Sequence, residues 1–271
     1  MTGLLALPLL AGSCGAGTAE VRQVEAASGP VVSVRIKAVQ TPVTGGPSQE
    51  TPLDQRVGIL GLTLLKGPND PSPLAVLTRS SPIDVPYNAG CNTLLGSVPA
   101  STLAPGTYTL SRLVVSSVKF TVAGSYHLGA MSVPGEFTDV VALTAGTSLD
   151  GATRDRGWWS SSFAANGTTM GQTSGDHAVI ARPGASSRIA LDLHGPVAAY
   201  VSPVDITIPP SIARDMELLF TVDTYQDFHW QDETDSGYRT GVFDVSDSSF
   251  EPVTQLGANS FTVSFGPVSS R

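Results

Sequence analysis

The stretch "TLAPGTYTLSRLVVSSVKFTVAG", Thr102 to Gly124, decides how this chain folds. Its segment Ala104–Thr107 has proline and glycine where a tight turn needs them. Apolar and polar residues alternate over Tyr108–Val115, and "VKFTVAG" follows as a second segment of the same kind. Such alternation is typical of half-buried β-strands. The stretch therefore predicts a turn and two strands, with Leu113 or Val115 facing the core.

The same period of two recurs on both sides of this stretch. Apolar residues alternate with polar ones in "VVSVRIKAV" near the start and in "MELLFTVD" in the last third. Further short apolar segments are separated by proline, glycine and asparagine, with strands expected at intervals of about 8–12 residues. We therefore predict an all-β, sandwich-like fold with little helix. It forms either one extended sandwich or two β-domains that meet near residues 136–150.

The composition agrees with a β-rich globular protein. The chain has 271 residues, of which 28 are glycine and 20 proline, and charged residues make up only 14%. A protein of long helices would contain more glutamate and lysine and fewer of these helix breakers. With 15 basic against 23 acidic residues the net charge is −8, so there is no basic surface for nucleic acid, and none is expected as a partner.

The segment "LPLLAGSCGAG" predicts where the protein works. The apolar run Leu4–Leu10 is shorter than the roughly 20 residues that cross a bilayer, but it suits a signal peptide core of about 7–15 residues. Small residues then precede Cys14, in an arrangement that resembles the bacterial lipobox. We expect residues 1–14 to be a lipoprotein signal peptide with lipid on Cys14, and residues 15–29 to be a flexible tether.

Cys14 has other possible roles. An ordinary cleaved signal peptide and a buried structural cysteine remain open, and so does a disulfide with Cys91, the only other cysteine, in an oxidising compartment. Two cysteines and four scattered histidines show no zinc-ligand spacing.

Two motifs resemble a bacterial lipoprotein family known as domain of unknown function 4382. The family pairs a "V-x-V-x-I-x-x-V" strand, here Val32–Val39, with an "L-x-P-G-x-Y-x-x-x-R-L-V-V" segment, here Leu103–Val115. Between them "SPIDVPY" takes the place of a further family strand. The resemblance covers residues 30–135 and implies a β-sandwich-like domain on a lipid-anchored protein of the bacterial cell envelope, at the outer membrane or cell surface. It implies no activity or catalytic residue, and residues 136–271 are a continuation or a second β-domain.

Aromatic side chains are candidates for a ligand site. Trp158, Trp159, Trp230 and Tyr238 lie among polar neighbours, where exposed rings stack on sugar rings and polar groups bind hydroxyls. The alternative is that these rings fill the core or cover the edges of sheets.

Acidic residues gather in the last third of the chain. Asp227, Asp232 and Asp235 are candidate Ca²⁺ ligands, because a hard cation needs several oxygen atoms from neighbouring loops. The segment is not an EF-hand, since Phe243 occupies the position of the last acidic ligand. The alternative is a solvated acidic loop.

No catalytic motif is present, and in particular no G-x-S-x-G segment. We therefore predict a non-enzymatic, membrane-tethered protein without an obligatory cofactor, with a binding or adhesion role toward a polysaccharide or an envelope protein. Two alternatives are a carbohydrate-active hydrolase that uses acidic residues of the 223–247 region, and a structural envelope component without a small ligand.

Overall fold

The computed structural model describes residues 29–268 except 130, 179, 234–236 and 248. In these residues the fold is all-β, as predicted, and its helices are two short 3₁₀ turns, η1 (Ala100–Thr102) and η2 (Ala185–Ser187). The strands are β1 (Val31–Val39), β2 (Gln49–Glu50), β3 (Asp54–Leu65), β4 (Leu74–Pro86), β5 (Asn92–Pro99), β6 (Gly106–Leu128), β7 (Met131–Ala142), β8 (Gly146–Thr147), β9 (Thr153–Arg154), β10 (Trp159–Ala165), β11 (Thr168–Gly175), β12 (Ala190–Asp192), β13 (Ala198–Ile208), β14 (Met216–Asp223), β15 (Phe228–Trp230), β16 (Asp244–Ser246), β17 (Val253–Gln255) and β18 (Ser260–Pro267).

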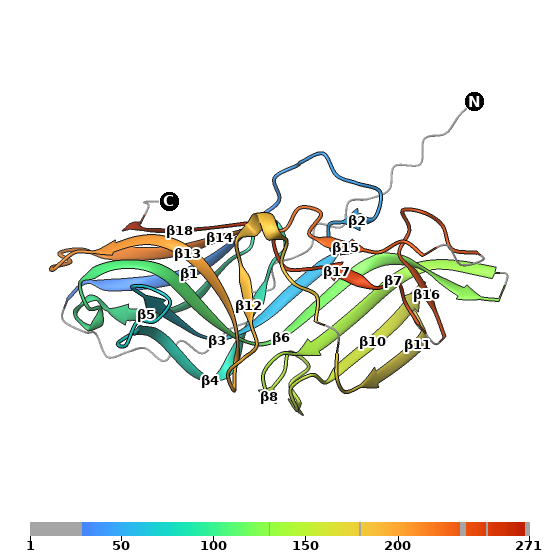
Figure 1. Cartoon of the computed structure of the whole chain (residues 1–271), viewed down its shortest axis with the longest axis horizontal. Coiled ribbons are helices and arrows are strands. Elements are labelled where there is room, and N and C mark those ends of the chain that lie inside the picture. The colour runs from blue at the N-terminus through green and yellow to red at the C-terminus, as the bar shows by residue number, and fades with distance from the viewer. Residues whose placement is uncertain (1–28, 130, 179, 234–236, 248, 269–271) are drawn as a thin grey trace.

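Strand β6 joins the two halves of the molecule (Figure 1). The sequence predicted two strands here, and the structure corrects this to one strand of 23 residues. On one edge its partner changes from β13, which pairs as far as Val115, to β7, which pairs from Ser117 onward. At the change, the carbonyl of Ser116 accepts the N–H groups of Leu143 and Thr144 at 2.7 and 2.9 Å. The polar pair Ser116-Ser117 therefore marks a change of neighbour and not a break in the strand.

One half is a sandwich of two sheets. The sheet β18-β14-β1-β5 packs on the sheet that contains β4, β3, β6 and β13 (Figure 1). The alternation seen in the sequence is confirmed, because Val32, Val34, Ile36 and Ala38 of β1 are at most 1% exposed. Leu113 and Val115 of β6 are also buried, at 2% and 0%.

The other half is a curled sheet in the order β16-β6-β7-β10-β11. A small sheet of β17, β15 and β2 lies beside it, and the inward rings of these elements form an aromatic core. Phe228 contacts Phe120 and Phe243 with ring centroids 5.3 and 5.1 Å apart. The core of this half is therefore built from stacked and edge-on rings, whereas aliphatic side chains predominate in the sandwich half.

Strands from residues 30–135 and 136–271 belong to the same sheets. β1 pairs in parallel with β14, and β6 pairs with both β7 and β13. This pairing favours the prediction of one extended body over two separate β-domains. No helix in the described ranges is long and apolar enough to cross a bilayer.

Candidate functional site

The register of the curled sheet places polar residues in one row across its inner face. Asp139 of β7 pairs with Ser161 of β10, and Ser161 pairs with Thr173 of β11. Residues opposite one another on neighbouring strands point to the same side of a sheet. Three polar side chains thus cross a face that is otherwise apolar.

Apolar rows lie on both sides of this polar row. On one side Val141 pairs with Trp159, and on the other Phe137 pairs with Phe163. Phe163 is followed across the sheet by Gly171, and a side chain there would meet the hydroxyl of Tyr126 at 2.8 Å. The glycine allows the Tyr126 ring to reach over the edge strand.

A hairpin, described over residues 244–247 and 249–251, covers this face. Val245 and Phe250 form a β-bridge, and the N–H of Ser246 donates to the carbonyl of Ser249 at 2.7 Å. Phe250 lies over the sheet, with its ring centroid 4.9 Å from that of Phe137 and 6.5 Å from that of Trp159. We call residues 244–247 and 249–251 the covering hairpin.

Buried acids hold the covering hairpin in place. Asp244, which is 0% exposed, lies 2.6 Å from the His127 imidazole and accepts the N–H of Arg239 at 2.7 Å. Glu251, also 0% exposed, accepts the N–H groups of Glu233 and Asp244 at 2.7 and 2.8 Å. These carboxylates are committed to backbone donors and so organise the loop.

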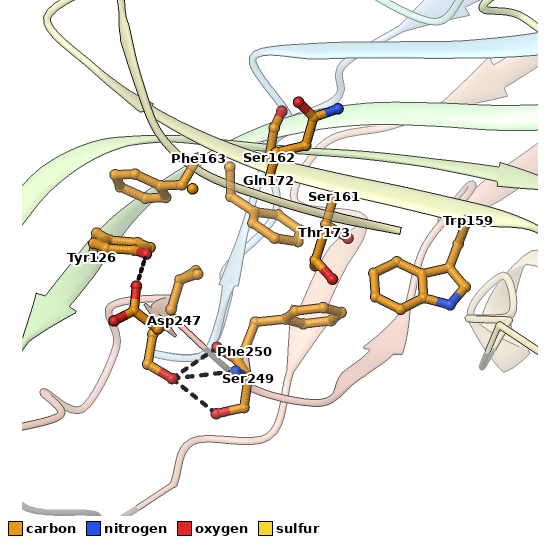
Figure 2. A pocket seen from close by; sticks show the side chains of 14 residues that line it. Tyr126, Trp159, Ser161, Ser162, Phe163, Gln172, Thr173, Asp247, Ser249 and Phe250 are labelled. Atoms are coloured by element: carbon orange, nitrogen blue, oxygen red, sulfur yellow. Dashed lines mark hydrogen bonds between the residues drawn. The ribbon is translucent and has the colours of Figure 1, made fainter. Parts of the chain in front are cut away.

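Two cavities lie over the inner face of the sheet, and both are lined by Trp159 and Phe250. The covering hairpin closes the first, whereas the second is closed by Phe250 together with the loop after β11 and the segment around β17. The small cavity has a volume of about 140 Å³ and extends toward Phe163, Tyr126 and Asp247. Figure 2 shows it with Ser161 and Thr173 between the rings, while Ser162 and Gln172 point away from them. In the same view the Tyr126 hydroxyl donates to the Asp247 carboxylate.

The large cavity has a volume of about 490 Å³ and lies on the other side of Trp159 and Phe250. Its walls are mainly aliphatic and aromatic, and Asp139 lies among them. Asp139 is 8% exposed and accepts a hydrogen bond from the Ser161 hydroxyl at 2.7 Å. Burial raises its pKa to about 6, although hydrogen bonds from Ser161 and the Val140 N–H act in the opposite direction.

Of the four predicted aromatic ligand residues, only Trp159 lines either cavity. Trp158 carries the Arg154 guanidinium 3.7 Å above its ring. Trp230 is 5% exposed and its indole N–H donates to Asp232 at 3.1 Å, so it belongs to the core. The ring of Tyr238 lies 4.8 Å from that of His127. These positions do not form one platform, and they leave Trp159 as the candidate ligand residue.

The predicted calcium ligands have other roles where the structure describes them. Asp227 is fully buried, accepts the N–H of Gly257 at 3.2 Å, and has its pKa raised to about 7 by burial. Asp232 accepts the Ser48 hydroxyl at 2.5 Å and the Gly241 N–H at 3.1 Å. Asp235 lies outside the described residues. Within the described ranges no three acidic, histidine or cysteine residues are grouped to hold a metal ion, and calcium binding stays a prediction.

Asp139 and Phe250 were not among the predicted site residues. A local signal for Asp139 exists in "FTDVVA", residues 137–142, where an acid occupies the same face of a strand as Phe137 and Val141. No comparable signal marks Phe250, because its position depends on how the covering hairpin packs on strands more than 80 residues away in the sequence.

The predicted lipid site, Cys14, lies outside the described residues, as do the rest of the signal segment and almost all of the predicted tether. Cys91 is 1% exposed and is in a disulfide. Comparison with known proteins adds no assignment, because the chain matches no protein-family model, no curated protein and no solved structure.

Proposed function

We propose that this chain is a non-catalytic binding protein of the bacterial cell envelope that holds a sugar ring in the small cavity beside Trp159. The observation that carries the proposal is the half-buried Trp159, which lines the small cavity together with other aromatic rings and with hydroxyl-bearing side chains. An aromatic face packs against the apolar face of a pyranose, and neighbouring polar groups bind its hydroxyls.

The size and chemistry of the small cavity suit a single ring. Its volume of about 140 Å³ is close to that of a protein cavity of about 150 Å³ that takes up benzene. Thr173, Asp247 and Ser249 supply hydroxyl and carboxylate oxygen atoms at its wall. A ligand with one apolar face and several hydroxyls matches this lining better than a wholly apolar one.

The lining supports binding over cleavage. Hydrolysis of a glycosidic bond uses two carboxyl groups separated by about 5–9.5 Å. Among the described residues that line the small cavity, Asp247 is the only carboxylate, and it accepts a hydrogen bond from Tyr126. The other described acids between residues 223 and 247 include Asp223, which accepts the N–H groups of Thr41 and Tyr225. The hydrolase alternative therefore has less support from the geometry.

Two features support a location outside the cytoplasm. The "LLAGSC" segment before residue 15 resembles a lipidation signal, and a disulfide at Cys91 is a bond of oxidising compartments. The two features are alternatives, because this chain has two cysteines and the Cys14 sulfur cannot both carry lipid and pair with Cys91. With lipid on Cys14, the tether would hold the protein to a membrane. With a disulfide between the two cysteines, the protein would be exported without this anchor.

Binding is tested by substituting Trp159. The full chain is incubated with insoluble cellulose, chitin and peptidoglycan, and bound and released material are measured. We expect retention on at least one polymer without release of sugar. Trp159→Ala should reduce retention at least tenfold, while Trp158→Ala, the adjacent tryptophan that stacks under Arg154, should not.

The opposite outcomes are equally definite. Equal losses in the two variants, or no retention on any polymer, would refute the sugar site. Release of soluble sugar would support the hydrolase, and co-purification of an envelope protein without polymer binding would support the structural alternative.

The anchor is tested by mass spectrometry of the protein from a bacterial host. Lipidation predicts a mature chain that begins at acylated Cys14 and incorporates a palmitate analogue, with the label lost in Cys14→Ser. An unlabelled protein in which the two cysteines are cross-linked would refute the lipid anchor and leave an exported, disulfide-bonded protein.

A further inference from the structure

The large cavity is a second site, which the sugar proposal does not use. Its volume of about 490 Å³ lies in the range of small-molecule sites, about 300–1,000 Å³. The aliphatic part of the wall comes from distant segments: Val118 on β6, Val141 near the end of β7, Leu143 just after it, Ile180 in the loop after β11, and Leu256 after β17. Trp159 and Phe250 close the side toward the small cavity.

One carboxyl group stands within this apolar wall. Asp139 shares its face of β7 with Phe137 and Val141, and its neighbour across the sheet on β6 is Phe120. The Ser161 hydroxyl is the side-chain donor that the structure gives it. A carboxylate has room for about four hydrogen bonds, so acceptor capacity remains.

The described lining contains no lysine or arginine to balance this acid. Asp139 forms no ion pair within the described part of the chain. The other titratable groups of the wall are Asp176 and His177, both exposed. The wall of the cavity therefore presents carboxylate oxygen atoms to a bound ligand.

We propose that the large cavity binds an organic amine, with the apolar body of the ligand against the aliphatic wall and its ammonium group at Asp139. A cation in this position supplies the charge that the wall lacks and hydrogen bonds for the free acceptor sites of the carboxylate. A ligand acid of the same shape would bring a second negative charge to Asp139, and an alcohol would bring a hydrogen bond without charge.

Three probes with a phenyl ring on a four-carbon chain separate these cases: 4-phenylbutylamine, 4-phenylbutanol and 4-phenylbutyrate. Binding to the full chain is measured by titration calorimetry at pH 8, where the amine is charged. We expect the amine to bind at least tenfold more tightly than the alcohol, and the butyrate to bind weakest. Asp139→Asn keeps the shape and the contact with Ser161, and it should make the amine and alcohol affinities equal.

Two further variants serve as controls. Asp176→Asn removes the exposed carboxylate of the same wall and should leave the preference for the amine in place. Ala178→Phe places a ring within the wall of the large cavity and should weaken all three probes, while a thermal melt confirms that it is folded.

The proposal is overturned if the alcohol binds as tightly as the amine, if the butyrate binds best, if Asp139→Asn keeps the preference, or if none of the probes binds. The sugar site is judged separately, because polysaccharide retention depends on the small cavity and is measured without amine.

Discussion

Asp139 is a buried carboxyl group whose ionisation destabilises the folded protein. It is 8% exposed, and its folded-state pKa of about 6 lies above the ordinary value of 3.8. The folded state therefore holds the proton more tightly than the unfolded state does. The free energy of unfolding should therefore fall as the pH rises from about 4 to about 6. Above pH 6 the folded protein carries the full penalty for burying the ionised carboxylate.

Asp139→Asn is expected to remove this dependence. At pH 8 the free energy of unfolding of the variant should be about 3 kcal/mol higher than that of the wild type. At pH 4 the two free energies of unfolding should be nearly equal. Urea denaturation at both pH values measures the difference. Asp176→Asn, at an exposed position, should change neither value by more than about 0.5 kcal/mol. A variant that is less stable than the wild type at pH 8 would contradict the assignment.

Single residues could be predicted where burial follows from the local pattern alone. Alternation predicts that Leu113 or Val115 faces the core, and both are buried. Asp139 was not selected, because its role depends on pairing with Ser161 and on Phe250 and the loop after β11, which close the cavity from distant parts of the sequence. Trp159 was selected together with Trp158, and the sequence could not tell which of the two faces a cavity.

At the scale of elements, β6 shows where alternation fails as a guide. Ser116 and Ser117 are both buried and interrupt the period of two, so the sequence suggested a break. Their hydroxyls lie 3.2 Å apart, and that of Ser116 reaches the Gly58 carbonyl at 3.4 Å. Polar side chains that satisfy one another in this way are compatible with the interior of a sheet.

The covering hairpin is the element on which both cavities depend. Glu251→Ala removes the acceptor for two backbone N–H groups, those of Glu233 and Asp244. Hydrogen bonds to a charged group contribute about 1.5–3 kcal/mol each, so we expect the hairpin to open more readily. Amide hydrogen exchange of residues 244–251 should accelerate at least tenfold.

The matched control for this variant is Glu136→Ala, which removes an exposed glutamate from β7. It should leave exchange in the covering hairpin unchanged. Unchanged exchange in Glu251→Ala would mean that ring packing by Phe250, and not the buried carboxylate, holds the hairpin closed.

At the scale of the whole molecule, the sheets cross the middle of the sequence. β1 has β14 on one side, and β6 has β13 and β7 on the edge opposite to β3. A chain of residues 30–135 would expose these edges and the apolar face that β14 and β18 cover. We expect this fragment to show no cooperative thermal transition by circular dichroism, in contrast to residues 29–268. A sharp transition in the fragment would mean that the first half folds by itself.

The pairing of strands from the two halves of the chain could not be predicted from the sequence. The alternation in β1 and in β14 identified two strands, but the two are parallel neighbours separated by more than 170 residues. The sequence of neither strand predicts the strand with which it pairs. The fold class could therefore be predicted from periods and turns, whereas the strand order and the cavities between its parts required coordinates.

The parallel pair has a practical consequence. Val32, Met216 and Pro267 lie side by side on β1, β14 and β18, so the two ends of the described chain emerge about 10 Å apart, two strand spacings of about 4.8 Å. Figure 1 shows these ends at one extremity, with β7, β10 and β11 at the other. The body can thus be spliced as a guest into a surface loop of a host protein through short connectors. Its long axis would then point away from that host, with the cavities at the end farthest from the junction.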